Sequence, residues 1–474
     1  MTSLSFGTSG LRGLVTDLRG APAQDWTRAF LRHVEAGGKL ATTTLLVGRD
    51  LRSSSPDIAA DCITAAQSLN WRVLDCAALP TPALALAARN MGAAAIMVTG
   101  SHIPDDRNGL KFYMPGEITK TDEAAIRTLH SRLMHETAAK SLNPVESASE
   151  TALGLYMARY RDFFPPGCLD GMTIGVYQHS TVIRDILVKL LDAFGAKAIP
   201  LGRTEIFLPV DTEAHRPEDL ERLTGWASES QFQAIVSADG DADRPLLADE
   251  AGQVLRGDTL GILTADYLEA DTIVTPVTSS SLVETSGVAQ RVVRSRVGSP
   301  FVIAAMEEAT EAYGGTVIGF EANGGVLLGT EVRLPGGLLK PLPTRDAILP
   351  LLCVLAAARK GGITVGQLAA TVGSNHAMAD RLKDVPAFRS GPFLNRLWAD
   401  EAYVAECLAE LGPIRSRDRV DGVRFCLDDG ASVHFRASGN APELRVYVEA
   451  ETEERARILQ GIALRIAKNA TVSA

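Results

Sequence analysis

Short apolar runs of strand length alternate with longer amphipathic stretches along most of the chain, and this alternation predicts an α/β protein. In the first 145 residues, the pattern predicts strands at 44–47 and 93–98 and a helix at 55–69 that begins at a Ser-Pro cap. Further predicted elements are strands at 173–177, 272–275 and 316–320 and helices at 154–164, 182–194 and 300–313. We therefore expect a succession of α/β units.

The pattern changes near residue 374. Short alternating strands are predicted at 422–427, 432–435 and 444–448, followed by a helix. One face of that helix carries the apolar residues Leu459, Ile462, Ala463 and Ile466. This last part is expected to form a separate α+β lobe.

The length of 474 residues and the hydrophobic content of 46% allow several cores, so the chain is expected to have three to four domains. The polar segment Ser141–Ser147, which contains one proline, is a predicted linker. No internal sequence repeat is visible. The boundaries that we predict are 1–146, 147–250 and 251–372 for three α/β domains and 373–474 for the α+β lobe.

A serine lies directly after one of the predicted strands. The stretch Val98–Lys111 reads VTGSHIPDDRNGLK, and Ser101 in it lies at the mouth of strand 93–98. Ligands of open α/β sheets bind beyond the carboxyl ends of parallel strands, so this serine is placed for chemistry. Gly100 is interpreted as leaving the approach to the serine open. The alternative is a surface turn, and the stretch alone does not decide between the two.

Three alternating aspartates follow the apolar strand of the stretch Gln231–Arg244. In an extended loop, Asp239, Asp241 and Asp243 would project to one side, where three carboxylates suit a hard cation such as Mg²⁺. A calcium-binding EF-hand loop is disfavoured because Arg244 occupies the position where that loop needs glycine. A solvated acidic turn without a metal is the remaining alternative.

Several basic residues are candidates for the same site. Asn108-Gly109 is a turn pair predicted to fold Lys111 back toward Ser101, although a solvated lysine on a strand edge is the usual outcome. His102 is adjacent to the serine and is equally ambiguous. The turn Arg49–Arg52 is interpreted as a structural salt link.

Two later segments carry groups that bind sugars or anions. Glu321 leaves strand 316–320 with a carboxylate that can accept from two sugar hydroxyls, or it caps a glycine turn. The turn between the last two strands can direct N–H groups at an anion, with charge from flanking arginines, or it is a structural hairpin. Its candidate ligands are Arg436, Ser438, Gly439, Asn440 and Arg445.

Composition excludes several classes of partner. The net charge is −10, and no lysine or arginine cluster is long enough to follow a nucleic-acid backbone or an anionic membrane, so neither partner is expected. The six cysteines lack CxxC spacing and are interpreted as reduced, buried thiols. No secretory signal or uncharged membrane span is recognisable, which makes the cytoplasm the expected compartment.

Five segments carry a resemblance to the α-D-phosphohexomutase superfamily, and within it to the bacterial phosphomannomutase and phosphoglucomutase type. They are Phe6–Gly13, Thr99–His102, Asp239–Arg244, Gly319–Gly325 and Arg436–Glu443. They occur in the family's order and span nearly the whole chain. The resemblance implies three related α/β domains and a C-terminal α+β lobe around a central cleft, with the serine, metal, sugar and phosphate loops in domains one to four.

The resemblance also implies an isomerase mechanism. Ser101 would be phosphorylated and would complete a Mg²⁺ site with the three aspartates. It would transfer its phosphoryl group to a hexose phosphate, giving a hexose 1,6-bisphosphate that turns over in the site and also serves as activator. A hinge before the fourth domain would open and close the cleft. The implied catalytic residues are Ser101, Arg12, His102, Lys111 and Arg244, and the implied sugar and phosphate contacts add Arg296 and Asn323 to those named above.

Departures from the family pattern leave the sugar open. Gly100 and Ile103 replace the usual Ala and Asn, the sugar loop reads FEANGG where GExSGH is common, and Asn440-Ala441 replaces Thr-Glu. Mannose phosphate is preferred, as a source of GDP-mannose for surface polysaccharide, before glucose and glucosamine or N-acetylglucosamine phosphates. A metal-dependent sugar phosphatase and a non-catalytic sugar-phosphate sensor are alternatives of other classes. We expect a monomer or a dimer.

Overall fold

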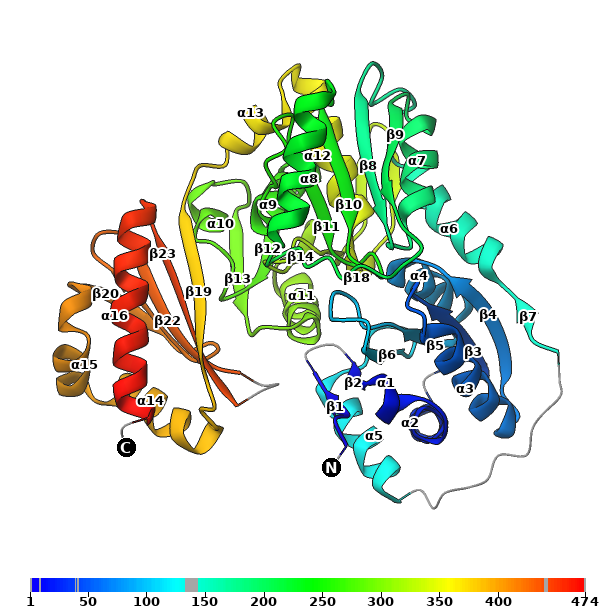
Figure 1. The fold of residues 1–474 in the computed structure, drawn as a ribbon, viewed down its shortest axis with the longest axis horizontal. Helices are drawn as coiled ribbons and strands as arrows, with labels where there is room; N and C mark the ends of the chain where they lie inside the picture. Colours follow the sequence, from blue (N-terminus) through cyan, green and yellow to red (C-terminus); the bar gives the residue numbers. More distant parts are fainter. Residues whose placement is uncertain are drawn as a thin grey trace.

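The computed structural model describes residues 2–7, 10–38, 40, 42–132, 144–438 and 442–472. These residues form four larger sheets and one two-stranded ribbon. The four sheets follow one another along an arc, with the first sheet at one end and the fourth at the other (Figure 1). The predicted α/β architecture with a C-terminal α+β lobe is confirmed.

The first sheet surrounds the predicted serine strand. Its strand order is β1 (Ser5–Phe6), β2 (Leu11–Leu14), β6 (Arg107–Tyr113), β5 (Ala94–Val98), β3 (Thr44–Arg49), β4 (Arg72–Ala78) and β7 (Glu146–Ser147). Its helices are α1 (Val15–Leu18), α2 (Ala21–Gly37), α3 (Ser55–Ser68), α4 (Thr81–Met91) and α5 (Lys120–Arg132). The predicted strands and helix of this part are confirmed as β3, β5 and α3.

The predicted linker is only partly a linker. Glu146 and Ser147 form the short strand β7, which pairs in parallel with β4 at the edge of the first sheet. The prediction was wrong for these two residues because backbone pairing with an open sheet edge outweighs their polar character. Residues 141–143 lie outside the described residues.

The second and third sheets also contain the predicted elements. The second has the order β11 (Pro245–Ala248), β10 (Ala234–Ala238), β8 (Thr173–His179) and β9 (Lys197–Arg203), with α6 (Ser149–Arg161), α7 (Arg184–Ala193) and α8 (Pro217–Glu229). The third has the order β13 (Arg291–Ser295), β12 (Thr272–Pro276), β14 (Val317–Phe320), β15 (Val326–Leu328) and β18 (Leu342–Asp346). Its helices are α9 (Gly257–Tyr267), α10 (Leu282–Thr285), α11 (Ser299–Tyr313), α12 (Ile348–Gly361) and α13 (Val365–Ala370), and β16 (Val332–Leu334) with β17 (Gly337–Leu339) forms the ribbon.

One four-strand arrangement recurs in all three sheets. Three parallel strands are followed by an antiparallel neighbour, as β4-β3-β5-β6, β9-β8-β10-β11 and β13-β12-β14-β15. This confirms the expected related topology of the three units. The loop that enters the antiparallel strand carries Ser101 in the first unit, the aspartates in the second and Glu321 in the third.

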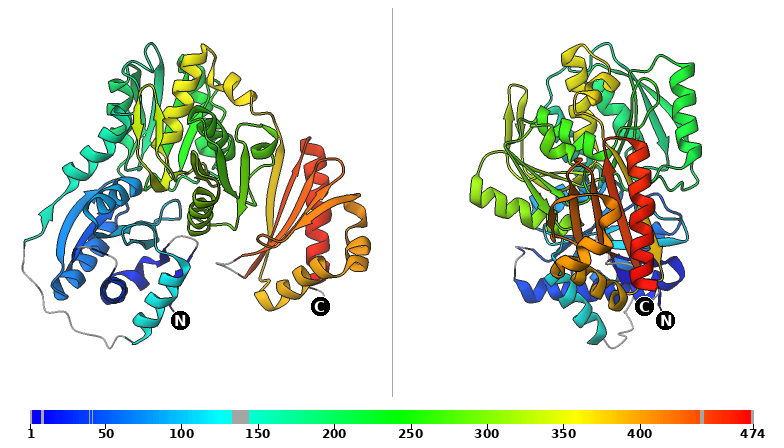
Figure 2. Two further views of the ribbon diagram at one scale, coloured as in Figure 1. Left: turned by 180° about the vertical axis from the view of Figure 1, so that it is seen from behind. Right: turned by 90° about the vertical axis from the view of Figure 1, so that its left-hand side faces the viewer.

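The C-terminal lobe is built on an antiparallel sheet. Its order is β19 (His376–Lys383), β23 (Glu443–Ala450), β22 (Ser432–Ala437), β21 (Val423–Leu427) and β20 (Ile414–Asp418). Its helices are α14 (Ala387–Ala399), α15 (Glu401–Cys407) and α16 (Glu453–Val472), with a 3₁₀ turn at Ala409–Leu411. Figure 2 shows the long helix α16 running along the strands. Leu459, Ala463 and Ile466 are buried against the sheet, and Ile462 is partly buried, as predicted.

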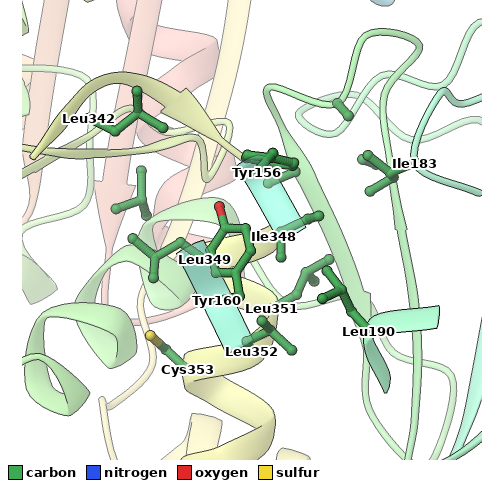
Figure 3. Packing of buried hydrophobic residues seen from close by; sticks show 14 of the residues in the cluster. Tyr156, Tyr160, Ile183, Leu190, Leu342, Ile348, Leu349, Leu351, Leu352 and Cys353 are labelled. Carbon is green, nitrogen blue, oxygen red and sulfur yellow. The ribbon is translucent and has the colours of Figure 1, made fainter. Parts of the chain in front are cut away.

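A continuous hydrophobic cluster runs through the first three units, whereas the lobe has a cluster of its own. Figure 3 shows part of the shared cluster, where Tyr156 and Tyr160 of α6 lie beside the apolar residues of α12. Both tyrosine hydroxyls donate to the buried carboxylate of Asp346 at the end of β18, which also accepts from the backbone N–H of Ile348 at 3.0 Å. The end of β18 is therefore held in place by the packing of α6 and α12.

The prediction of buried thiols is wrong for three of the six cysteines, since Cys168, Cys407 and Cys426 are only partly buried. Cys62, Cys76 and Cys353 are buried, and the six cysteines are free thiols. Burial raises the pKa of Cys62 and of Cys76 to about 12, which keeps these thiols protonated. Among the described residues, no helix is both long enough and apolar enough to cross a membrane.

Candidate active site

The three topologically equivalent loops meet at one place. The hydroxyl of Ser101 donates to Asp239 Oδ2 at 2.5 Å, and both side chains are fully buried. From the third unit, Glu321 pairs with Arg345, which in turn contacts Asp243. We call the set formed by Ser101, Lys111, Asp239, Asp241, Asp243, Arg244, Glu321 and Arg345 the charged centre.

The aspartate loop is a turn, so its predicted extended conformation was wrong. Ala242 has a left-handed backbone (φ 59°), and its N–H donates to the carbonyl of Asp239 at 3.2 Å. The three carboxylates nevertheless converge, because the turn brings their oxygens within 4.8 Å of one another. The convergence thus comes from a closed loop and not from strand-like alternation.

The carboxylate oxygens of the trio fit a hard cation. Asp241 Oδ2 accepts from Thr81 Oγ1 and Lys111 Nζ, and Asp243 Oδ2 accepts from Lys111 Nζ and Arg345 Nη2. In both residues the second oxygen, Oδ1, is buried without a hydrogen-bond partner among the described residues. A buried carboxylate oxygen without a donor is costly, and a divalent cation with oxygen preference would satisfy it. The donor set present is therefore suited to Mg²⁺.

Each of the two loops that touch contains a residue with a strained backbone. Ser101, like Ala242, is a non-glycine residue with a left-handed backbone (φ 56°). Such residues cost about 1–3 kcal/mol and persist only where the surroundings enforce them. Here the backbone of Ser101 is held by its N–H donating to Thr99 Oγ1 at 2.8 Å and by its carbonyl accepting from Arg52. The serine is thus fixed in position before any ligand binds.

Gly100 has a different role from the predicted one. A Cβ at this position would lie 2.6–2.8 Å from the guanidinium of Arg52, so the glycine makes room for that arginine rather than for a ligand. Arg52 is buried, pairs with Asp50 at 3.1 Å and donates to the carbonyls of Ile103 and Pro104. The predicted structural salt link in the turn Arg49–Arg52 is confirmed.

Lys111 is positioned at the site by strand β6 and not by the predicted turn. Asn108 and Gly109 lie inside β6 and do not form a turn, so that prediction was wrong. The glycine is needed for sheet pairing, because a Cβ there would lie 2.3 Å from the carbonyl of Leu11 on the neighbouring strand β2. Lys111 is buried, with Nζ at 2.6 Å from both Asp241 and Asp243, so it is not a solvated lysine.

The charges of the centre alter one another's protonation. Burial and the neighbouring Asp241 and Asp243 raise the pKa of Asp239 well above its ordinary value. Burial acts in the same direction on Asp243, but Arg345, Lys111 and Arg244 outweigh it and lower the pKa. For Lys111, burial acts to lower the pKa, but Asp241 and Asp243 raise it above its ordinary value. The centre therefore holds a protonated Lys111 beside an ionised Asp243.

Arg244, Arg12 and His102 surround the trio more loosely. Arg244 Nε lies 3.7 Å from Asp243 Oδ1, and its Nη1 lies 3.7 Å from Glu213. Burial and the nearby Arg244 lower the pKa of Arg12 to about 10. His102 Nδ1 lies 3.3 Å from Ser101 Oγ, and burial followed by Arg244 and Arg12 lowers its pKa, so the imidazole is neutral.

The sugar-loop residues are close to the trio, and a residue that the sequence analysis missed connects them. Asn323 is buried, and its Oδ1 accepts from the N–H of Gly325 at 3.0 Å. Arg345, at the end of β18, pairs with both Glu321 and Asp243. Its own strand reads LPTRD and is not an apolar run, so the signal that revealed Glu321 is lacking for Arg345. Thr81, at the start of α4, was missed as well.

The remaining candidates lie on the lobe and the loop that faces it. Arg296 is exposed, and its guanidinium stacks on Phe301 at 4.4 Å. Arg436 is buried and pairs through Nε with Asp421 at 2.7 Å, whereas Arg445 is partly exposed and lies 3.5 Å from Glu443. No contact of Arg296, Arg436 or Arg445 with the charged centre is observed among the described residues.

Two of the predicted phosphate ligands cannot be placed. Ser438 follows β22, and its N–H donates to the carbonyl of Glu443 at 2.9 Å. Gly439 and Asn440 lie outside the described residues.

Comparisons with known proteins agree with the geometry. Family models described as phosphoglucomutase/phosphomannomutase match residues 3–136 (alpha/beta/alpha domain I), 256–374 (alpha/beta/alpha domain III) and 394–464 (C-terminal domain). A curated phosphomannomutase of Sinorhizobium fredii is 47% identical over 97% of this chain and 98% of its own length. One of Salmonella muenchen is 39% identical over 96% of this chain and 94% of its own.

A solved structure shows the same fold. It is a phosphoglucomutase/phosphomannomutase family protein from Burkholderia thailandensis, which superposes with a TM-score of 0.78 over 98% of both chains at 19% identity. At this identity the likeness concerns the fold alone.

Proposed function

The chain belongs to the phosphoglucomutase/phosphomannomutase family of isomerases, and on this premise we propose that it interconverts mannose 1-phosphate and mannose 6-phosphate. Two curated relatives that match nearly the full length are named phosphomannomutase, which supports mannose over the other hexoses. The observation that carries the proposal is the 2.5 Å contact of the Ser101 hydroxyl with Asp239 at the edge of a buried carboxylate trio.

Ser101 is the residue to which we assign the transferred phosphoryl group. In the transfer, the bond between phosphorus and the serine oxygen breaks as a bond forms to the free hydroxyl of the hexose phosphate, and that hydroxyl loses its proton. Positive charge around the phosphoryl group during its transfer would come from Lys111, Arg244 and Arg12. The neutral imidazole of His102 is the candidate to accept that proton, and the protonated Lys111 is the candidate to donate one to the serine oxygen as it leaves.

Asp239, Asp241 and Asp243 are the residues to which we assign a Mg²⁺ ion, since two of their buried oxygens lack donors. Such an ion supplies neutralisation of the phosphoryl oxygens when it is bound. Ser101 is placed to present its phosphate beside these carboxylates, because its hydroxyl already contacts one of them.

Glu321 and Asn323 would orient the sugar ring, and the lobe would hold the phosphate that does not react. Three arginines of the lobe, Arg381, Arg445 and Arg436, are direct cross-strand neighbours on β19, β23 and β22. Like charges in that arrangement repel, so an anionic ligand would stabilise them. This arginine row supports the assignment of the phosphate loop, to which we also assign Ser438, Gly439 and Asn440. In the proposal, Arg296 contacts the sugar from the third unit.

The reaction accounts for the domain organisation that we propose, with boundaries after residues 146, 250 and 372. Each of the first three domains contributes one loop to the charged centre, and the fourth contributes the second phosphate grip. A hexose 1,6-bisphosphate that reorients between the two sites serves as intermediate and activator. We place the reaction in the cytoplasm, where it would supply mannose 1-phosphate for GDP-mannose and surface polysaccharide.

The proposal is tested by isomerisation of a panel of sugars. Mannose, glucose, glucosamine and N-acetylglucosamine 1-phosphates are each supplied with Mg²⁺ and a trace of the matching 1,6-bisphosphate, and formation of the 6-phosphate is followed by ³¹P NMR. We expect kcat/KM for mannose 1-phosphate to exceed the others by roughly tenfold, which one well-placed hydroxyl contact can provide. A preference for another hexose would overturn the sugar assignment.

The same samples distinguish the other classes of function. A phosphatase would release inorganic phosphate in proportion to the sugar consumed, and a sensor would bind the sugar phosphates without changing them. For a mutase, we expect the sum of the two sugar phosphates to stay constant while their ratio approaches equilibrium.

A further inference from the structure

Arg345 occupies space that a side chain at position 325 would otherwise fill. A Cβ on Gly325 would lie 2.8 Å from Cδ and 2.9 Å from Cγ of Arg345, and 2.6 Å from the carbonyl oxygen of Asp243. Real Cβ atoms do not approach other atoms so closely. The arginine and a larger residue at position 325 are therefore mutually exclusive in this conformation.

The backbone at Arg345 is anchored on both sides. Thr344 donates through its hydroxyl to Glu117 of the first unit at 2.8 Å. Asp346 accepts from the two buried tyrosines of α6. Because both neighbours are fixed by contacts to other units, Arg345 projects from a rigid position and not from a mobile loop.

The guanidinium of Arg345 bridges two carboxylates that come from different units. Nη2 and Nε donate to Asp243 Oδ2 at 2.6 and 3.2 Å, and Nη1 donates to Glu321 Oε2. Arg345 is 2% exposed, so these contacts are screened little by solvent. On Asp243 the arginine occupies Oδ2 and leaves Oδ1 without a donor. The planar fork of an arginine fixes the orientation of both carboxylates at once.

We propose that Arg345 is a positioning residue that couples the sugar-binding carboxylate Glu321 to the metal-binding carboxylate Asp243, in the space that Gly325 leaves open. The proposal rests on the proposed function, because it assigns the sugar to one carboxylate and the cation to the other. When one ligand orders its carboxylate, the rigid fork orders the other, so each ligand binds more tightly in the presence of its partner. Such a coupling is reciprocal by thermodynamic necessity.

The test is a binding cycle measured by isothermal titration calorimetry on the full chain. All proteins carry Ser101→Ala, so that no turnover occurs during the titration. The dissociation constant of Mg²⁺ is measured with and without saturating mannose 1-phosphate, and that of mannose 1-phosphate with and without saturating Mg²⁺. The ratio of the two constants gives the coupling factor.

Three variants separate the coupling from a general loss of structure. Arg345→Gln removes the fork, and Arg345→Lys keeps the charge but cannot bridge. Gly325→Ala crowds the side chain of Arg345 and also the carbonyl of Asp243, without removing the arginine. Arg333→Gln is the matched control, because Arg333 lies on the ribbon of the same unit and its side chain is 73% exposed. Melting temperatures identify any variant that fails to fold.

We expect the coupling factor to fall at least about threefold in Arg345→Gln and in Gly325→Ala, and less in Arg345→Lys, while Arg333→Gln keeps the parent value. A merely structural arginine would weaken both ligands but leave their coupling unchanged. The proposal is overturned if the parent shows no coupling, or if Arg345→Gln and Gly325→Ala retain it.

Failure of this proposal is distinguishable from failure of the proposed function. If the parent binds glucose 1-phosphate and not mannose 1-phosphate, the sugar assignment is wrong. The same cycle with glucose 1-phosphate then still decides the role of Arg345.

Discussion

The charged centre and the C-terminal lobe differ in their hydrophobic packing and in the exposure of their charged side chains. The centre lies where three units share one continuous hydrophobic cluster, and its charges are buried and in direct contact. The lobe has its own core, and two of its row of three arginines, Arg381 and Arg445, lie partly exposed, whereas Arg436 is buried. Packing thus joins the first three units into one body, whereas the lobe is a separate one.

Polar contacts connect the lobe to the third unit. Glu449 accepts from the hydroxyl of Ser280 and from the N–H of Ser281. Asp421 accepts from the N–H of Val297 at 3.1 Å as well as from Arg436. Polar links of this kind exchange readily with water, unlike a shared apolar core. On the proposed function, chemistry is kept in a rigid centre, and the second phosphate is held by a part that polar contacts leave able to move.

Removal of the nucleophile is expected to have the largest effect. In Ser101→Ala, turnover should fall by at least roughly 10³-fold, because the covalent step is lost, while mannose 1-phosphate still binds. Steady-state kinetics and calorimetry measure the two quantities. An alanine variant that isomerises at the parent rate would show that the centre is not the place of the chemistry.

Neutralisation of one carboxylate of the metal loop is expected to have the second-largest effect on activity. Asp241→Asn removes one partner of Lys111 and one charge from the trio, so Mg²⁺ should bind roughly 10²-fold more weakly, with a similar loss in kcat. Calorimetric titration with Mg²⁺ measures the affinity. Asp380→Asn, on the exposed strand β19, is the control. Equal Mg²⁺ affinity in the variant and the parent would count against the metal assignment.

Substitution in the lobe should affect binding more than chemistry. Arg436→Gln removes a charge-assisted contact to phosphate, which is worth about 1.5–3 kcal/mol, so KM should rise by roughly 10- to 100-fold while kcat changes less. Arg424→Gln is a matched control, since Arg424 also pairs with an aspartate and lies on the adjacent strand β21. If kcat falls and KM does not, the lobe takes part in the chemical step, and the comparison fails.

Weakening the polar link between the lobe and the third unit is expected to have the smallest effect on the kinetics. Asp421→Asn keeps an acceptor for Val297 but weakens the ion pair that orients Arg436, so KM should rise by roughly three- to tenfold. Progress curves at several substrate concentrations measure KM. A fall in KM would mean instead that Asp421 competes with the substrate phosphate for Arg436.

Local sequence patterns were sufficient to predict most helices and strands and to identify the candidate site residues at strand ends. Ser101, the three aspartates and Glu321 all follow apolar strands, and a ligand-binding role for such positions follows from sheet geometry. Apart from the turn of the aspartate loop, the errors concern contacts between segments that lie far apart in the sequence. Asn108-Gly109 looks like a turn, but its glycine serves pairing with β2, and Gly100 serves the packing of Arg52. Arg345 was missed because nothing in its own segment shows that Gly325 leaves it room.

By itself, the sequence determined the identity of the chemical groups and the strands that carry them, because periodicity and turn residues act over a few positions. Only the tertiary structure decided that loops 138 residues apart, at Ser101 and Asp239, meet at 2.5 Å. That meeting depends on three sheets of the same topology burying a common hydrophobic cluster, and the free energy of such burial arises from surfaces that no local window contains.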